Sequence, residues 1–414
     1  MEAGFEIERV KPPRFPRLKQ KLDNLPTFLG ETQLLLKTRT YYFRRESPDD
    51  SKREAWAAGG SIAYESGWFM DRIKIGTELF TSQKLHGPRD RGGTGLLAPV
   101  QRHYNVLGQA YALLKLAEHH EVSAYRQVYD LPYVNKNDSR MTPNTFEGYS
   151  IKGKFKKKGR RPKIEYIGGY IAQMKKRNAD HFVPMGEAAG APGDADEGTI
   201  MGGLRVSPTD DLAFGAINYY TRDVLNIFYA EGSYTWTGKK NLGFRLKAQI
   251  TDQRSVGDDR LTGSSFKARV GGAELSASYK SAILRAAFSA ASDNRDITSP
   301  FGSYPGYVSL MRSDFNSAGE NAWLLGFSYD FKRLGLKGLS AFTNYASGYD
   351  LVDPATDMSL PNEREIDVTV DYKVPDGRFR GFWVRLRGGF VDHGGAANWT
   401  KEYRVIVNYE IPLL

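Results

Sequence analysis

The chain has 414 residues, with 58 Lys and Arg against 48 Asp and Glu, and its formal net charge is +10. Its mean hydropathy is −0.50, and no stretch approaches the run of about 18 apolar residues that a transmembrane helix needs, which excludes a membrane bundle of helices. Cysteine is absent, which excludes disulfides, thiolate metal sites and iron–sulfur clusters, while the positive charge alone would suggest nucleic acid or another polyanion as a partner.

The first 31 residues form a distinct segment. Residues 5–25 are basic and too rich in proline for a strand, so we expect residues 1–31 to be a periplasmic lead or a partial plug. Met1–Val10 has no basic region followed by an apolar one. Either the protein is cytoplasmic or, as we expect, a secretory signal has been removed from a mature sequence.

From residue 32 to the end, apolar and polar residues alternate with a period of two, which predicts strands with one apolar face. Between residues 242 and 253, for example, Leu242, Phe244 and Leu246 alternate with Arg245 and Lys247. Most predicted strands have about 10 to 14 residues, close to the length of a tilted transmembrane strand. The eighteen predicted strands are 32–44, 55–66, 70–81, 105–118, 120–129, 145–155, 161–172, 198–207, 211–222, 224–237, 241–253, 262–279, 282–292, 321–331, 338–347, 363–374, 379–391 and 401–411.

Long and short connections alternate between these strands. The odd-numbered connections are mostly long, as at 82–104, 173–197 and 293–320, and the even-numbered ones are short; the connection near 221–224 breaks the rule. All the long loops would therefore leave one end of the sheet, as in outer-membrane barrels. The sequence predicts an all-β fold, a transmembrane antiparallel β-barrel of 18 strands around an aqueous channel, covering residues 32–414.

The alternation also assigns charged side chains to the lumen. On the strand near 382–390, Phe382, Val384 and Leu386 take the lipid face, so Arg385 and Arg387 point inward. The first, second-last and last strands are neighbours in a closed barrel, so their cations are predicted to form one basic wall. The cations assigned to the lumen are Lys37, Arg39, Arg245, Lys247, Lys267, Arg269, Arg285, Arg385, Arg387 and Arg404.

Two interpretations of these cations remain open. A column of guanidinium groups offers successive bidentate sites to a carboxylate, so a small anion could be passed along the wall. The cations could instead pair with facing acids such as Glu365, Asp367 and Asp371.

Four segments resemble the OprD-type substrate-specific porins of Gram-negative outer membranes: Leu36–Phe43 (LKTRTYYF), Tyr125–Tyr149 (YRQVYDLPYVNKNDSRMTPNTFEGY), Ser313–Glu320 (SDFNSAGE) and Tyr403–Leu414 (YRVIVNYEIPLL). The resemblance implies an 18-stranded barrel whose third and seventh external loops fold inward to form a constriction. It also implies diffusion of small carboxylate-bearing solutes past an arginine ladder. The ladder positions that the resemblance implies are Arg39, Arg126, Arg385, Arg387 and Arg404. Together with Lys37 and Arg285, which the alternation assigns to the lumen, they make up the predicted ladder.

The resemblance also indicates constriction residues in both inward loops. In the third loop, about 130–144, they are Asn137, Asp138, Ser139 and Arg140. In the seventh, about 293–320, they are Tyr304, Tyr307, Arg312 and Asp314, with Asp314 the candidate acid opposite the ladder. The extra Lys37 and a fourth loop rich in Gly, Ala and Asp depart from the family pattern, so the family's substrate preference is not carried over.

Other signals carry less weight. The basic run Lys154–Lys163 is predicted to be a solvated turn, so no nucleic acid is expected. The six His residues form no metal motif, Gly193–Gly198 (GDADEG) lacks the spacing of a calcium loop, and no GxSxG elbow marks a nucleophile. We therefore expect no metal, no cofactor and no enzymatic activity.

The predicted function is passive, substrate-selective diffusion of small carboxylate-bearing or zwitterionic solutes through an outer-membrane porin. The expected partners are these solutes, outer-membrane lipid and lipopolysaccharide, and we expect a monomer or a weak oligomer. The alternative within the same fold is a general or oligosaccharide-selective porin, in which lumen aromatics such as Trp383 stack sugars. Outside it, the alternatives are a receptor or adhesin with a closed pore and an outer-membrane enzyme.

Overall fold

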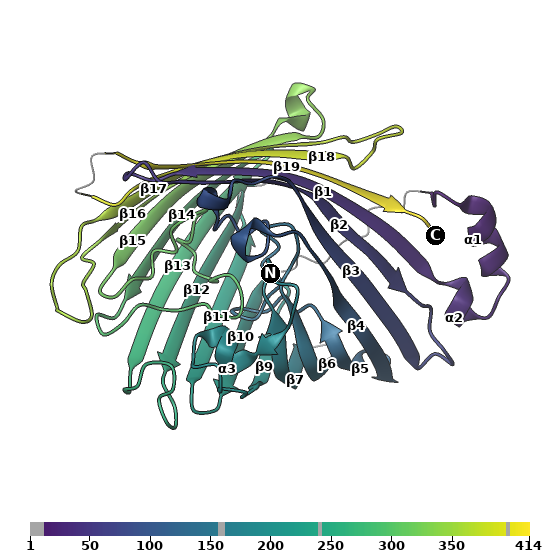
Figure 1. The fold of residues 1–414 in the computed structure, drawn as a ribbon, viewed down its shortest axis with the longest axis horizontal. Coiled ribbons are helices and arrows are strands. Elements are labelled where there is room, and N and C mark those ends of the chain that lie inside the picture. The colour runs from purple at the N-terminus through teal and green to yellow at the C-terminus, as the bar shows by residue number, and fades with distance from the viewer. Residues whose placement is uncertain (1–11, 156–161, 239–241, 395–397) are drawn as a thin grey trace.

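The computed structural model describes residues 12–155, 162–238, 242–394 and 398–414. In this part of the chain, 18 antiparallel strands close into a barrel (Figure 1). The strands are β1 (Gln33–Glu46), β2 (Lys52–Glu65), β3 (Ile73–His86), β4 (Tyr104–Ala117), β5 (His120–Gln127), β6 (Thr145–Phe155), β7 (Lys163–Lys175), β9 (Thr199–Ser207), β10 (Leu212–Thr221), β11 (Leu225–Thr237), β12 (Gly243–Arg254), β13 (Lys267–Tyr279), β14 (Ala282–Ala291), β15 (Asn321–Asp330), β16 (Leu339–Tyr349), β17 (Glu363–Lys373), β18 (Trp383–Asp392) and β19 (Thr400–Pro412). The remaining elements are β8 (Val183–Pro184), which pairs with the end of β7, the helices α1 (Pro16–Asp23), α2 (Thr27–Gly30) and α3 (Met185–Ala189), and three short 3-10 turns.

The first and last strands close the barrel. Each lumen-facing position of β1 has a partner on both sides: Lys37 lies opposite Ser61 of β2 and Glu410 of β19. Closure of this kind satisfies the backbone N–H and C=O groups of every strand, as hydrocarbon demands. No helix in the described ranges is long and apolar enough to cross a membrane.

The predicted barrel is confirmed, and each predicted strand overlaps one observed strand. The end of β3 is predicted at 81 and observed at His86. Two strand starts also differ: β13 is predicted from residue 262 and observed from Lys267, and β18 is predicted from 379 and observed from Trp383. In both places a turn precedes the strand, and turn residues continue an alternating pattern by chance.

The connections are unequal at the two ends. Six long ones leave one end, at 87–103, 128–144, 176–198, 255–266, 292–320 and 350–362, together with the short 47–51, 222–224 and 393–399. The other end carries shorter turns, such as 118–119 and 280–281. By the architecture of outer-membrane barrels, the long-loop end is external. We name 128–144 loop 3, 176–198 loop 4 and 292–320 loop 7.

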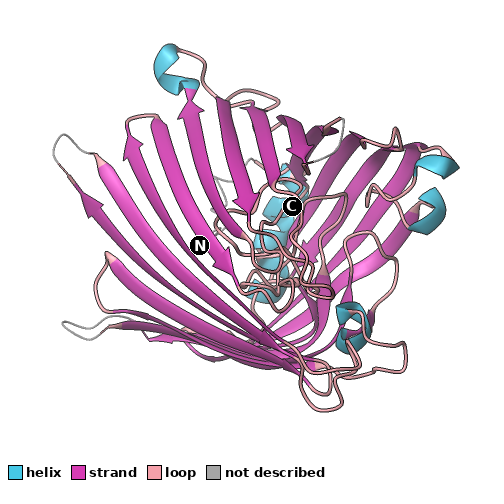
Figure 2. Ribbon diagram, turned by 90° about the vertical axis from the view of Figure 1, so that its left-hand side faces the viewer, coloured by secondary structure: helices cyan, strands magenta, loops and turns pink. Residues whose placement is uncertain are grey.

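Loops 3, 4 and 7 fold into the barrel, and Figure 2 shows loop segments gathered in its middle. Tyr133 of loop 3 and Phe301 of loop 7 are fully buried against inward-facing strand residues, including Val270 of β13. Along this part of the wall the inward side chains are therefore apolar.

The apolar inner face beside the inserted loops corrects one prediction. Lys267 and Arg269 alternate with the buried Ala268 and Val270, so both basic side chains face outward rather than into the lumen. Apolar residues that pack against an inserted loop look, in sequence, like residues that face lipid.

The described part of the N-terminal segment lies at the short-turn end. The backbone N–H groups of Arg14 and Phe15 donate to carbonyls of Pro412 and Leu413, and Gly67 donates to Phe28. Helices α1 and α2 thus sit beside the ends of β1 and β2 (Figure 1). Residues 1–11, part of the predicted lead or plug, and 156–161, in the predicted basic turn, lie outside the described residues.

Candidate channel constriction

Three neighbouring strands bring five predicted cations together. β18, β19 and β1 are adjacent, and the register sets Arg387 directly opposite Arg404. Arg385 lies in the next row of the same face, and Arg39 lies in the row after that. We call Lys37, Arg39, Arg385, Arg387 and Arg404 the basic wall. Two like charges directly opposite each other are destabilising unless their surroundings compensate.

Carboxylates and an aromatic ring supply that compensation. Glu402 accepts a hydrogen bond from Nε of Arg404 at 2.6 Å and another from Nε of Arg45 at 2.6 Å. The ring of Phe43 lies 5.8 Å from the Arg404 guanidinium carbon and 5.3 Å from that of Arg45. The face of an aromatic ring attracts cations, so Phe43 helps to hold these guanidinium groups together.

The rest of the wall is also paired with acids. Arg385 makes a bidentate contact with Asp371 of β17, at 2.7 and 2.9 Å. Nη2 of Arg387 lies 3.9 Å from a carboxylate oxygen of Asp367. On β1, Lys37 lies 2.9 Å from Glu78. Of the acids named in the pairing interpretation, two therefore do pair with wall arginines, and the wall consists of ion pairs rather than bare charges.

Loop 3 is fastened to this wall by the predicted residues. The carboxylate of Asp138 accepts hydrogen bonds from both terminal nitrogens of Arg39, at 2.6 and 3.0 Å. The hydroxyl of Tyr41 donates to the carbonyl of Ser139. Arg140 is buried and donates to the carbonyls of Thr94 and Ser139. Its charge has no carboxylate within ion-pair distance in the described ranges, and burial, followed by the charge of Arg404, lowers its pKa to about 9.

Loop 7 is fastened to β17 on the other side of the wall. Glu365 accepts the backbone N–H groups of Arg312 and Ser313, at 2.9 and 2.7 Å, and Arg404 donates to the carbonyl of Met311. Asp314 stays exposed and accepts a hydrogen bond from Ser309 at 2.6 Å.

The two predicted tyrosines of loop 7 have packing contacts. The ring of Tyr304 lies 6.1 Å from that of Tyr133, and Nζ of Lys247 lies 4.4 Å from the ring of Tyr307. Arg285 donates to the carbonyl of Tyr307 at 3.2 Å. Tyr304 and Tyr307 are both buried, so within the predicted constriction set Asp138, Arg312 and Asp314 are the better exposed to a solute.

Two predicted ladder members lie apart from the basic wall. Arg285 is on β14, 3.4 Å from Glu274, and Arg126 is on β5, where its Nε donates to Glu147 at 2.8 Å. The guanidinium carbon of Arg126 is 4.1 Å from the ring centre of Phe182 in loop 4. The barrel order places three strands, β15 to β17, between Arg285 and the wall, and three, β2 to β4, between Arg126 and the wall.

Sequence reasoning missed Arg177, at the start of loop 4. Its Nη1 donates to Oδ1 of Asn137 at 3.1 Å and to Oγ of Ser139 at 2.5 Å, both in loop 3. In the described part of the chain it has no carboxylate within ion-pair distance, and burial, together with the charge of Arg404, lowers its pKa. The only sequence signal was the basic run Lys175–Arg177 at a strand end.

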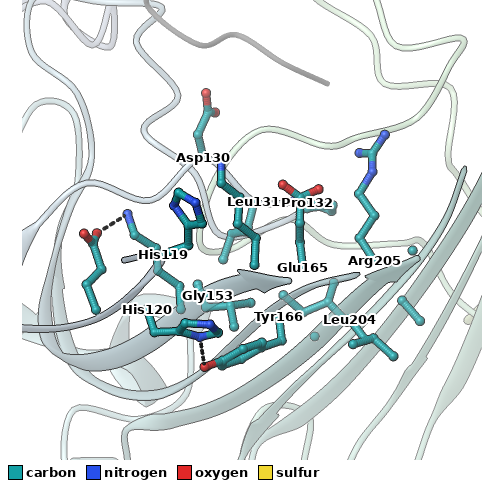
Figure 3. A pocket seen from close by; sticks show the side chains of 18 of the residues that line it. His119, His120, Asp130, Leu131, Pro132, Gly153, Glu165, Tyr166, Leu204 and Arg205 are labelled. Atoms are coloured by element: carbon teal, nitrogen blue, oxygen red, sulfur yellow. Dashed lines mark hydrogen bonds and ion pairs between the residues drawn. The ribbon is translucent and has the colours of Figure 1, made fainter. Parts of the chain in front are cut away.

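Below loop 3, a cavity of about 580 Å³ opens inside β4 to β11 (Figure 3). Asp130, Leu131 and Pro132 of loop 3 line it together with strand residues of both signs, such as Glu165 and Arg205. Its walls thus combine apolar side chains with charged side chains of both signs, whereas cations without an ion-pair partner among the described residues lie where loops 3 and 4 meet.

Within the described residues, no group of three or more His, Asp or Glu side chains is arranged to hold a metal ion. The acids of the loop 4 run 193–198 instead meet a cation, since Arg260 contacts Asp194 at 2.6 Å and Glu197 at 2.9 Å.

We expect the seating of loop 7 to weaken as the pH rises. Burial and the charge of Glu363 raise the pKa of Glu320, at the end of loop 7, from 4.5 to about 8. The folded loop therefore holds this proton more tightly than an unseated loop, so its stability is full below about pH 4.5 and falls up to about pH 8. Single-channel recordings should show more frequent excursions to a state of higher conductance at pH 8.5 than at pH 6.

The Glu320→Gln variant should lose most of this pH dependence, because its amide does not ionise. Other charged groups near Glu320 are Glu363 and Asp296, and His393 lies 3.4 Å from Glu363. A His393→Gln channel serves as the control. If that variant loses the pH dependence and Glu320→Gln keeps it, the assignment to Glu320 is wrong.

Comparison with known proteins places this geometry in context. The profile of a family described as "outer membrane porin, OprD family" matches residues 26–413. Porin D of Pseudomonas aeruginosa is 25% identical over 94% of this chain and 92% of its own length. Among solved structures, OccK9 (OpdG) of Pseudomonas aeruginosa superposes with a TM-score of 0.82 at 24% identity, covering 94% of this chain and all of that one. OpdK of the same species, solved with vanillate, gives 0.79 at 19% identity, covering 93% of this chain and all of OpdK.

Proposed function

The chain belongs to the OprD family of outer membrane porins, and from that premise we propose that it admits small solutes bearing a carboxylate, by passive diffusion. The family and the fold are those of channels in the Gram-negative outer membrane that pass small solutes. The proposal adds the chemical class of solute and the residues that select it.

The observation that carries the proposal is the cation at the meeting point of loops 3 and 4. Arg177 is held by the neutral oxygens of Asn137 and Ser139, and within the described ranges it has no carboxylate within ion-pair distance. A guanidinium group in a water-poor passage favours carboxylates, which it can bind through two parallel hydrogen bonds. Arg177 is thus the proposed entry contact, and the basic wall is proposed to receive the anion next.

Exposure decides which wall residues a solute can touch. The side chains of Lys37 and Arg385 are 36% and 27% exposed, whereas that of Arg404 is 4% exposed. We infer that Lys37 and Arg385 release their acidic partners, Glu78 and Asp371, and bind the solute instead. Arg404 is buried and would act on the solute only through its charge. The carboxylate of the solute and that of the protein then compete for the same cationic group, so the solute is not bound tightly and can pass on.

A solved relative supports the solute class. OpdK was crystallised with vanillate, an aromatic acid with one carboxylate. The oligosaccharide alternative has less support, because Arg385 lies over the Trp383 ring at 4.6 Å and the indole N–H donates to Asp371. At least one face of that ring is therefore covered and does not serve as a sugar platform.

We expect benzoate to enter proteoliposomes at least about tenfold faster than benzamide, which has the same shape without the charge, because a single favourable charge contact of about 1.4 kcal/mol gives this ratio. Liposome swelling or stopped-flow uptake would measure both rates, with maltose as a further neutral solute. Equal rates for benzoate and benzamide, or faster entry of maltose, would contradict the proposal.

A further inference from the structure

The outer face of β12 and β13 carries a cluster of charged side chains next to the external loops. Asp252 and Arg254 of β12 lie directly opposite Arg269 and Lys267 of β13. These four residues, here the outer quartet, alternate with the buried Gln253, Ala268 and Val270, so they point away from the lumen. The side chains of Arg254 and Arg269 are 50% and 52% exposed.

The position of the quartet along the strands fixes its surroundings. Toward the short-turn end, the same outer face carries exposed apolar side chains, Ile250 and Leu246 on β12 and Leu275 on β13. A charged side chain on the lipid face costs about 2–4 kcal/mol at the bilayer midplane and about 0–1 kcal/mol near the interface. The hydrocarbon boundary therefore falls between Ile250 and the quartet, which leaves the quartet among lipid headgroups of the outer leaflet.

The quartet differs from other charges on the external rim. Around Arg44 the outer face carries three bases, Arg44, Lys52 and Lys401, with two acids, Glu46 and Glu54, and Arg364 lies opposite Asp392. The quartet has three basic residues against one acid, and across the described part of the chain Lys267 has no ion-pair partner. Positive charge is therefore in excess at this place on the rim.

Asp252 arranges the two arginines. It accepts hydrogen bonds from Nη2 of Arg254 at 3.1 Å and from Nε of Arg269 at 2.6 Å, so both guanidinium groups are tied to one carboxylate. The remaining N–H groups of the two forks are free to contact lipid. Two arginines and a lysine held together in this way suit a phosphate monoester, which has several acceptor oxygens and up to two charges.

We propose that the outer quartet binds a phosphate group of the glycolipid that forms the outer leaflet, of the lipid A type. Three features support this occupant: the quartet faces lipid, it lies at the external headgroup level, and its charge is opposite to that of the phosphates. The site is independent of the lumen, so the transport proposal could fail while this one stands, and the reverse.

The test compares two triple variants with the parent protein. In the first, Arg254, Lys267 and Arg269 are replaced by Gln; in the second, the control, Arg44, Arg364 and Lys401 are replaced by Gln, all on the outer face elsewhere. Folding is checked by heat-modifiable migration on gels and by unchanged channel conductance. Binding of diphosphoryl lipid A in detergent is measured by native mass spectrometry, with dephosphorylated lipid A and phosphatidylglycerol as further probes.

The quartet variant should bind diphosphoryl lipid A at least about tenfold more weakly than the parent, and the control variant within about twofold of it, because two charge-assisted contacts are lost only in the first. Dephosphorylated lipid A should bind both variants and the parent alike. Equal binding of diphosphoryl lipid A by all three proteins, or equal loss in both variants, would overturn the proposal. So would tighter binding of phosphatidylglycerol than of diphosphoryl lipid A by the parent. If the quartet variant cannot be folded, Lys267→Gln alone should still weaken binding severalfold.

Discussion

Replacing Arg177 with Gln should shift the selectivity of the channel toward cations and reduce benzoate uptake by about tenfold. At about 7 Å and an effective dielectric constant of about 40, one unit charge contributes about 1.2 kcal/mol to a passing anion. Gln keeps a donor for the contacts with Asn137 and Ser139, so loop 3 should stay in place. The measurement is the reversal potential of single channels in a potassium benzoate gradient, together with the uptake rate in proteoliposomes.

The matched control for Arg177→Gln is Arg254→Gln, which removes the same charge from the outer face of the barrel. Uptake of benzamide should be the same in both variants and in the parent. If Arg254→Gln changes the reversal potential as much as Arg177→Gln, the effect belongs to overall charge and Arg177 has no special position. The wall variant Arg385→Gln is less informative, because it leaves Asp371 without its bidentate partner and adds a negative charge to the lumen.

Replacing Glu365 with Ala should widen the passage and remove much of its selectivity. The change leaves the backbone N–H groups of Arg312 and Ser313 without their acceptor, at a cost of about 1–3 kcal/mol each. Loop 7 is then expected to leave its seat, and single-channel conductance should rise by about twofold while benzoate loses its advantage over benzamide. Conductance in planar bilayers and the uptake ratio measure the two effects.

A control for Glu365→Ala is Glu46→Ala, which removes a carboxylate from the outer face of β1. This variant should retain the parent conductance. An unchanged conductance in Glu365→Ala would mean that the remaining contacts of loop 7, such as the donation from Arg404 to Met311, are sufficient to hold it. The hypothesis that Glu365 of β17 holds loop 7 in place would then be wrong.

Alternation in the sequence was sufficient for the barrel and for its basic wall. Strand residues such as Arg385, Arg387 and Arg404 lie where the period of two places them, because lipid on one face and water on the other impose opposite demands on neighbouring residues. The rule fails where the inner face meets protein instead of water, as at Ala268 and Val270 beside the inserted loops. Lys267 and Arg269 were for that reason assigned to the wrong face.

The constriction itself was harder to predict. The family resemblance indicated Asp138 and Asp314, but the position of loop residues depends on contacts between segments far apart in the chain, as between Arg177 and Asn137. Pairing across strands was also out of reach, since the contact of Arg385 with Asp371 needs the register of two strands. The sequence therefore predicted the sign of each strand charge and the face on which it lies, but the acids that pair with the cations were identified only from the structure.

Closure between β1 and β19 bears on how the protein assembles. The hydroxyl of Thr38 donates to the carbonyl of Tyr409 across a sequence separation of 371 residues, and the contacts of Arg14 and Phe15 with the last residues add a second link between the two ends of the barrel. Contacts of such long range form late, because the entropy of closing so large a loop must be overcome first. Until the final strand has joined the first, a chain still being inserted therefore has no closed lumen.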